Sequence, residues 1–435
     1  CPDPDAARRV TLPHMQWQRF DCELVTPLFG GGVKAREVDP TLPIRPTGLR
    51  GQWRFWWRLL ARHRDGLQGA ALRDEEFDVW GGLGTPPQAS KVWVRVDGVQ
   101  GLQLEDAMEY PEGKTFPKPQ PWAPALYALF PAQKGKSPNE QPVAKLAREG
   151  LRWQMHVGLR RGTDGLTDDQ CDRVWEALRW WASFGGVGAR TRRGLGAVRV
   201  SRVDGDRSQP LPPITPEEAR QAGCELVLTD QPAGRATDAW RVAIELLQRY
   251  RQGPGVGRNP GAQNRPGRSR WPEADAIRRA AHRQVKLHLP QHKAGDVWPR
   301  SYFGLPIVFH FKDPGDPEGH VLQPHDRKRM ASPLILSPMR RGSEDRWFPG
   351  ALLLPYDAVT NMDLILIRGA ELVRDIPADA VWPKDEQRRM DLACRILPMA
   401  GAKASPLDPL RSFLSFFKQP GAAPAGQSHQ GGARR

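Results

Sequence analysis

Several short stretches of the chain alternate apolar and polar residues with the period of two that is typical of a strand with one buried face. The alternation is clearest over residues 151–159, where Leu151, Trp153, Met155 and Val157 are separated by polar or basic residues. The same alternation predicts strands over 17–26, 91–96 and 197–200. Apolar residues that recur every three or four positions predict helices over 48–60 and 168–184. The order strand, helix, strand, strand, helix, strand is that of a ferredoxin-like domain.

A proline-rich segment, residues 210–216, separates this half from a second half with a similar mixture of elements. The second half is predicted to hold strands over 224–228, 305–311, 333–336, 351–354 and 362–367, and helices over 238–250, 273–287 and 407–418. We therefore expect an α+β protein with two ferredoxin-like (RRM-like) domains, residues 15–205 and 217–418, which carry long insertions. Residues 419–435 are rich in Gly, Ala, Gln and Arg and are expected to form a disordered tail.

The composition adds a strong basic bias to this picture. The chain has 435 residues, 39% of them hydrophobic, and 64 Lys or Arg against 49 Asp or Glu. Residues 251–300 alone hold eleven basic and three acidic residues. A protein this basic usually meets a polyanion, most often nucleic acid, and the alternative is a solvated basic surface. Five scattered cysteines and the lack of an apolar run of about 20 residues suit a cytoplasmic protein without a membrane partner.

Glycines and arginines gather in a few segments that could approach phosphates closely. The main one is the loop 185–196, which holds five glycines and three arginines between a predicted helix and a predicted strand. Three glycines follow the first strand, one helix carries a stripe of arginines, and an extended basic segment contains one aromatic residue. The predicted RNA-binding residues are Gly30, Gly31, Gly32, Arg50, Arg54, Arg58, Gly186, Gly188, Arg190, Arg192, Arg193, Arg258, Arg265, Arg268, Arg270 and Trp271. The alternatives are a tight turn, a solvated helix face and a flexible linker.

The sequence gives no catalytic set. His325 and Asp326 form a lone pair without the further ligands that a metal phosphohydrolase needs. Neither the GxGxxG fingerprint nor the P-loop pattern is present in the glycine-rich loop, and no Gly-x-Ser-x-Gly elbow occurs. We therefore predict no enzyme activity, no metal and no cofactor.

Several of these segments together resemble one family, the RAMP-superfamily proteins that form subunit one of the type III-B CRISPR (Cmr) effector complex. The similar segments are residues 24–32, 49–58, 184–196, 258–261, 265–272, 303–307 and 331–335. They are spread over about residues 20–370, and the insertion at 111–142 and the tail lie outside them.

The resemblance implies a non-catalytic subunit of a complex that carries a crRNA and finds complementary RNA in antiviral defence. Such subunits contact the crRNA 3′ region and the guide–target duplex beside other Cmr subunits. Two alternatives stay open: a RAMP endoribonuclease that processes crRNA precursors, with His14, His63 or His156 as candidates, and an assembly protein whose basic patches meet acidic partners. The resemblance does not assign single arginines to guide or target.

Overall fold

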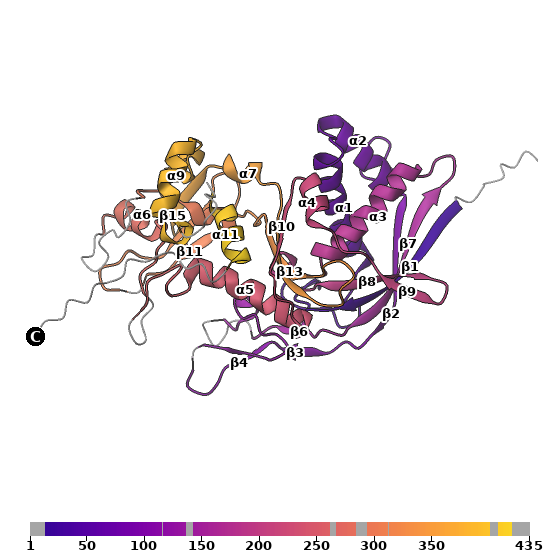
Figure 1. The fold of residues 1–435 in the computed structure, drawn as a ribbon, viewed down its shortest axis with the longest axis horizontal. Coiled ribbons are helices and arrows are strands. Elements are labelled where there is room, and N and C mark those ends of the chain that lie inside the picture. Colours follow the sequence, from indigo (N-terminus) through magenta and orange to yellow (C-terminus); the bar gives the residue numbers. More distant parts are fainter. Residues whose placement is uncertain are drawn as a thin grey trace, which may run out of the picture.

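The fold is given by a computed structural model that describes residues 14–114, 116–135, 142–261, 267–283, 294–311, 313–400 and 408–419. The first half is built on a five-stranded sheet of order β2-β7-β1-β8-β9 in which all neighbours are antiparallel (Figure 1). Its strands are β1 (His14–Leu24), β2 (Val92–Gln100), β7 (Arg152–Arg161), β8 (Val198–Asp204) and β9 (Arg207–Pro210). Along the chain, β1, β2, β7 and β8 are the first, second, third and fourth strands of this sheet. Their spatial order β2-β7-β1-β8 is that of a ferredoxin-like domain, so the predicted fold is confirmed here.

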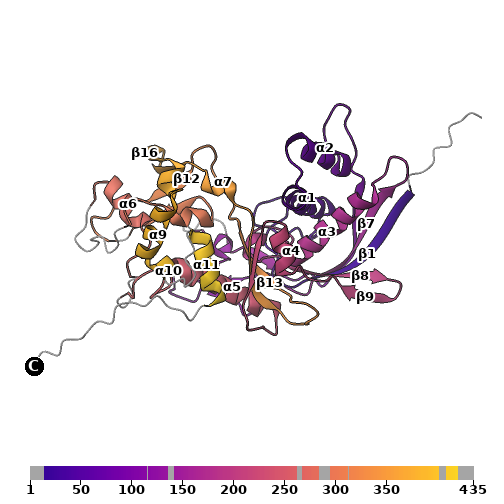
Figure 2. The same ribbon diagram turned by 45° about the horizontal axis from the view of Figure 1, so that its top comes forward.

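Helices cover one face of this sheet and leave the other face open. They are α1 (Pro46–His63), α2 (Gly69–Trp80) and α3 (Asp168–Phe184), with α2 packed on α1 away from the sheet (Figure 2). Every second residue of β7, including Trp153 and Met155, is buried beneath the helices. The tryptophans of α1 and α3, among them Trp53 and Trp181, fill the space between helices and sheet. The periodicity in the sequence therefore reflects a single apolar layer.

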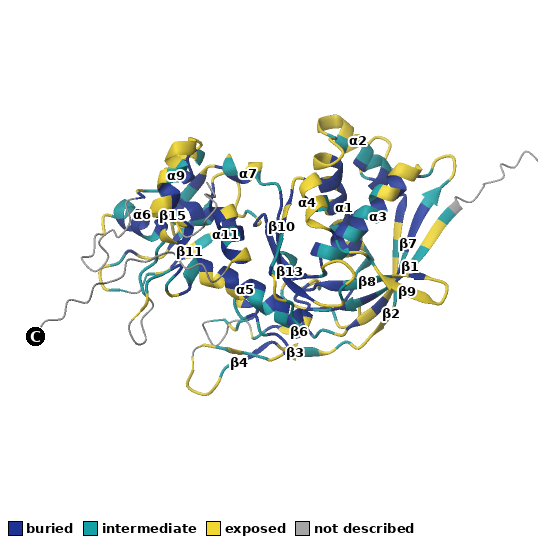
Figure 3. Ribbon diagram, in the orientation of Figure 1, coloured by how far each residue is buried: buried dark blue, intermediate teal, exposed yellow. Residues whose placement is uncertain are grey.

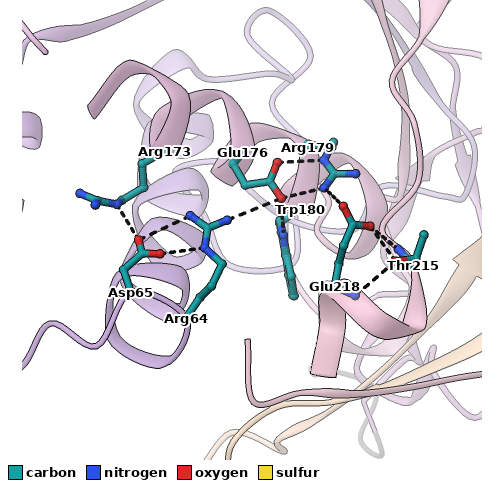
Figure 4. A network of polar contacts seen from close by, with 8 residues as sticks. All are labelled: Arg64, Asp65, Arg173, Glu176, Arg179, Trp180, Thr215 and Glu218. Carbon is teal, nitrogen blue, oxygen red and sulfur yellow. Dashed lines mark hydrogen bonds and ion pairs between the residues drawn. The ribbon is translucent and has the colours of Figure 1, made fainter. Parts of the chain in front are cut away.

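The ends of these helices are fixed by a chain of ion pairs (Figure 4). Arg173 of α3 donates to Asp65, which follows α1, at 2.7 Å. Arg179 bonds both Glu176 and Glu218, the latter in α4 (Pro216–Gln221) at the start of the second half. Each arginine of this network has a carboxylate partner, so its charge is compensated within the protein.

The second half contains a smaller sheet of order β10-β14-β13, also antiparallel between neighbours. Its elements are β10 (Glu225–Leu228), α5 (Ala236–Gln252), β13 (Leu334–Met339), β14 (Phe348–Leu353) and α11 (Pro409–Lys418). Both α5 and α11 pack on this sheet and on each other. The order is that of a ferredoxin-like domain without its fourth strand, which the described part of the second half does not contain.

The strands β13 and β14 are buried on both faces. Leu336 and Leu353 contribute to a core with α5 and the far end of the molecule. Ile335 and Leu352, their neighbours in sequence, contribute to the core of the first half. Because successive strand residues point to opposite faces, this small sheet lies between two apolar cores and joins the halves. Figure 3 shows the buried strands at the centre of the molecule.

The remaining elements form insertions, and those of the second half were not predicted as a sheet of their own. A four-stranded sheet of order β11-β12-β15-β16 combines one insertion after α5 with another after β14. Its strands are β11 (Ile307–Phe309), β12 (His320–Pro324), β15 (Leu364–Arg368) and β16 (Glu371–Ile376). The short helices nearby are α6 (Glu273–Ala280), α7 (Asp357–Thr360), α8 (Ala378–Val381), α9 (Glu386–Arg395) and α10 (Leu397–Ala400).

The first half inserts residues between β2 and β7 that reach across to the second. This insertion forms the strand pairs β3 (Leu104–Asp106) with β6 (Lys145–Ala147) and β4 (Met108–Glu109) with β5 (Lys118–Pro119). Its residues Trp122 and Leu129 belong to the same core as α5. No described helix is long and apolar enough to cross a membrane. Beyond Gln419, the segment expected to be a disordered tail lies outside the described residues.

Candidate nucleic-acid interface

The two glycine-rich segments predicted as separate loops pack directly against each other. The amide of Ala189 donates to Phe29 O at 2.7 Å, and that of Gly196 donates to Pro27 O at 2.8 Å. A Cβ atom at Gly188 would lie 2.7 Å from Phe29 O, so no side chain fits there. A Cβ atom added at Gly31 would lie 3.1 Å from the Cα of Gly188. The glycines are therefore needed first for contact between the loops.

This result corrects the role expected for most of the glycines. Gly30 and Gly186 are buried, and a Cβ at Gly186 would lie 2.6 Å from Gly196 O. Gly32 is half-buried, and its Cβ would lie 2.6 Å from Glu37 O. Gly31 and Gly188 stay exposed at the surface of the loop pair. Only these two have backbone that a ligand could approach.

The loop 185–196 carries its three arginines to the junction of the two halves. They lie on a turn over Thr191–Arg193, where Arg190 and Gly194 both adopt positive φ, at 61° and 75°. Gly194 is required there, because a Cβ would lie 2.6 Å from Leu336 O of β13. Trp240 of α5 donates its indole N–H to Arg193 O at 2.7 Å. The second half thus holds the turn in place.

Arg193 and Arg192 donate to backbone carbonyls and, among the described residues, to no carboxylate. Arg193 bonds Leu334 O at 3.0 Å and Phe303 O at 3.1 Å. Arg192 bonds Ser332 O and lies 5.5 Å from the ring centroid of Phe55 in α1. A pocket of about 240 Å³ opens between α1 and this loop. Carbonyl partners orient these guanidinium groups but leave their positive charge uncompensated.

The second half adds two more arginines at the same place. Arg251, at the end of α5, donates to Tyr127 Oη at 3.0 Å and lies over the Phe303 ring. Arg258 follows it, half-buried. We use the term junction cluster for Arg190, Arg192, Arg193, Arg251 and Arg258. Within the described residues, no carboxylate forms an ion pair with any of the five, in contrast to the network in Figure 4.

The arginines of the junction cluster lie close enough together to lower the pKa of one of their members. Burial, with repulsion from Arg251 and Arg190, lowers the pKa of Arg193 to about 9. Burial also lowers the pKa of Arg192, which is half-buried. These groups remain protonated at neutral pH, so their mutual repulsion persists there. An arrangement of this kind becomes more stable when an anion lies among the arginines.

The arginine stripe on α1 is for the most part neutralised. Arg54 and Arg58 both pair with Glu76 of α2, a carboxylate that is only 2% exposed. Arg50 is exposed, and no described carboxylate pairs with it. The prediction of a phosphate-binding stripe is therefore corrected for Arg54 and Arg58, since the fold supplies their counterion. The sequence did not show this, because α2 was not predicted.

The basic segment after α5 is folded, and two of its predicted contacts are wrong. Trp271 is fully buried against Tyr250, so it offers no stacking surface. Arg268 is buried in an ion pair with Asp275. Arg270 donates to Asn259 Oδ1 at 2.8 Å and closes the turn that follows α5. Arg265 lies outside the described residues.

The histidines considered for an endoribonuclease are not gathered at this site. His63 ends α1 on the covered side of the sheet, while His156 lies on the open face beside Asp97. His14 begins β1. No group of three His, Cys, Asp or Glu side chains that could hold a metal ion occurs in the part of the chain that the structure describes.

Two members of the site, Arg251 and Tyr127, were missed by reasoning from the sequence. Tyr127 lies in the insertion at 111–142, which packs on the second half. Arg251 ends a helix whose other residues follow an ordinary amphipathic pattern. A hint was the excess of basic residues that begins at position 251.

A ferredoxin-like sheet followed by a glycine-rich loop that presents arginines defines an α+β domain with a candidate anion site. Residues 21–199 match the family model of the RAMP superfamily. No curated protein matches the chain in sequence.

Two solved structures match most of the chain. Cmr1 from Pyrococcus furiosus, in its apo form, is 12% identical over 84% of this chain and 95% of its own, with a TM-score of 0.42. A chain of the type III-B Cmr-beta complex bound to cognate target RNA is 10% identical over 78% of this chain and 95% of its own, with a TM-score of 0.41.

Proposed function

We propose that the chain is a non-catalytic RNA-binding subunit of a type III-B CRISPR Cmr effector complex, contacting the crRNA 3′ region and the guide–target duplex in the cytoplasm. The observation that carries the proposal is the junction cluster, five arginines without carboxylate partners at the meeting point of both halves. The RAMP match and the segments that resemble subunit one of the Cmr complex supply the identity of the polyanion.

The contacts available at the junction cluster are contacts to phosphate. Arginine forks and the exposed backbone at Gly31 and Gly188 match phosphate oxygens and read no base. In a guide-directed complex, base pairing between guide and target reads the sequence, so backbone contacts are enough. Crucially, the turn holding Arg190 is fixed by both halves, which pre-organises the site.

The test is a pair of substitutions at Arg190 and Arg258, which have no described carboxylate partner and little structural role. RNA binding by R190Q/R258Q is measured across a salt series with two duplexes of unrelated sequence. We expect about tenfold weaker binding for both, and a salt slope reduced by roughly 1.4 to 1.8 for two lost phosphate contacts. The exposed Arg73 of α2, changed to Gln, is the matched control.

Unchanged affinity and slope in the double variant would remove the junction cluster from the RNA interface. Loss with one duplex only would contradict a contact to phosphates alone. The RNA is also inspected for cleavage, since products cut by the wild-type chain would favour an endoribonuclease.

A further inference from the structure

The open face of the first sheet carries two exposed tryptophans in one row. Trp17 of β1 and Trp93 of β2 both pair in register with Gly158 of β7, which lies between them. The indoles are 50% and 55% exposed, whereas most tryptophans described in this chain are buried. Two spacings between neighbouring strands, about 10 Å, separate their Cα atoms. Neighbouring exposed side chains of this size form the kind of apolar surface that marks a binding site.

Gly158 lets the ring of Trp17 approach the sheet closely. A Cβ atom at this position would lie 2.9 Å from Trp17 Cη2 and 2.8 Å from Met15 Cε, so the indole and the methyl group occupy the space above the glycine. The ring is thus supported from below and open to solvent above. An aromatic side chain fixed in this way loses little further freedom when a flat ligand stacks on it.

Basic side chains border the tryptophan row on both sides. Arg160 follows Gly158 by two residues on β7 and lies in the row on one side. The row on the other side holds Arg95 of β2, His156 of β7 and Arg19 of β1. Arg95 and His156 both contact Asp97, at 3.0 and 3.3 Å. Arg160 lies 3.9 Å from Asp164.

Arg19 differs from these neighbours, because it is exposed and no described carboxylate pairs with it. The acidic residues Asp21 and Glu23 lie one and two rows further along β1. The other basic side chains beside the tryptophan row have carboxylate partners, so Arg19 is the one described there whose charge is left for a ligand.

We propose that this face binds a single-stranded stretch of nucleic acid, with one base stacked on Trp17, one on Trp93, and the backbone beside Arg19. Exposed aromatic rings beside an arginine can stack with unpaired bases while the arginine contacts a phosphate. A duplex cannot bind in this way, because its bases already stack on each other. That the strand is RNA rests on the proposed function. The stacking site itself does not, as it shares no residue with the junction cluster.

The surroundings favour a nucleic acid over a protein partner. A surface for protein docking would continue the apolar area around the rings, as interface cores do. Here the residues next to the rings are a glycine and basic side chains, with Met15 the one further apolar contact described at Gly158. The unpaired charge of Arg19 beside two exposed rings therefore favours a polyanion with exposed bases.

The experiment uses the full chain carrying R190Q/R258Q, so that the junction cluster contributes little. The probes are a short oligouridylate and an abasic ribose-phosphate oligomer of the same length. We expect Trp17→Leu and Trp93→Leu each to weaken oligouridylate binding by about tenfold and to leave abasic binding unchanged. Trp→Phe at either position should keep most of the affinity. Quenching of a 2-aminopurine base placed in the oligonucleotide reports stacking directly.

Phe116, 78% exposed outside this face, provides the control substitution to Leu. Equal losses for both probes, no loss in either leucine variant, or an equal loss from Phe116→Leu would each overturn the stacking site. Such a result leaves the proposed function standing if R190Q/R258Q still weakens duplex binding. If the leucine variants weaken oligouridylate binding while R190Q/R258Q leaves duplex binding unchanged, the stacking site stands and the junction cluster is rejected.

Discussion

At the scale of single residues, the partner of an arginine separates structural guanidinium groups from those free to bind. Arg268 and Arg278 lie buried with Asp275 and Asp316, so their charges are balanced inside the protein. Arg190 is exposed on its turn, with no described carboxylate beside it. Both kinds of arginine look the same in the sequence. Their energetic roles should nevertheless be opposite.

Substituting one arginine of each kind should show this difference. Arg268→Gln should lower the free energy of unfolding by about 3 kcal/mol, because it removes a partner from buried Asp275. Arg190→Gln should change it by less than about 0.5 kcal/mol, since the side chain is exposed and the backbone conformation is kept. Urea unfolding followed by tryptophan fluorescence measures both. A comparable loss from Arg190→Gln would show that this residue supports the fold.

At the scale of elements, the two glycine-rich loops connect β1 to α1 and α3 to β8, and they also carry the candidate site. Thr26 shows how tightly they are built: its hydroxyl donates to Gly194 O at 2.7 Å and accepts from the Ala197 amide at 2.8 Å. The loop 185–196 therefore sits on the end of β1 and under β13 at once. A change inside it moves the arginines as well.

Two glycine-to-alanine substitutions test this view in opposite directions. Gly196 has φ of +71°, and an added Cβ would overlap the carbonyl oxygen of Val187, so Gly196→Ala should cost at least about 2 kcal/mol. Gly51 lies in helix α1 with nothing within 4 Å of its Cβ position, so Gly51→Ala should stabilise by about 0.5–1 kcal/mol. Thermal and urea unfolding measure both. A neutral Gly196→Ala would mean that the loop can shift as a unit.

Sequence periodicity predicted the elements that bury one face, and it failed where burial comes from distant segments. The helix 168–184 and the strand order of the first half were predicted, because a single amphipathic layer leaves a clear period. Trp271 sits among arginines and glycines, and nothing local shows that Tyr250 covers it. Likewise, the sequence around Arg54 and Arg58 predicted an uncompensated basic stripe, because nothing local shows that Glu76 of α2 pairs with both.

The candidate site was predicted in part for the same reason. The glycine loop with Arg190, Arg192 and Arg193 was visible as a local motif. Arg251 and Tyr127 reach it only through the packing of the insertion and α5. The four-stranded sheet of the second half joins β12 to β15 across two insertions, a pairing that no local pattern encodes.

At the scale of the whole molecule, the small sheet of the second half couples both halves. Neighbouring residues of β14, Leu352 and Leu353, point into the two different cores. The arginine turn of the first half lies against β13 and accepts a hydrogen bond from α5. A binding site at such a junction exists only while both halves are folded together.

We therefore expect the described chain to unfold as one cooperative unit. Leu352→Ala and Leu353→Ala each remove a buried side chain from a different core, and each should cost about 2–5 kcal/mol. If the cores are coupled, both variants lower the midpoint of one shared transition, seen alike by calorimetry, tryptophan fluorescence and circular dichroism. Two separate transitions, each moved by only one variant, would show that the halves fold alone. The junction cluster would then depend on docking between them, and RNA affinity should vary with temperature before any unfolding is seen.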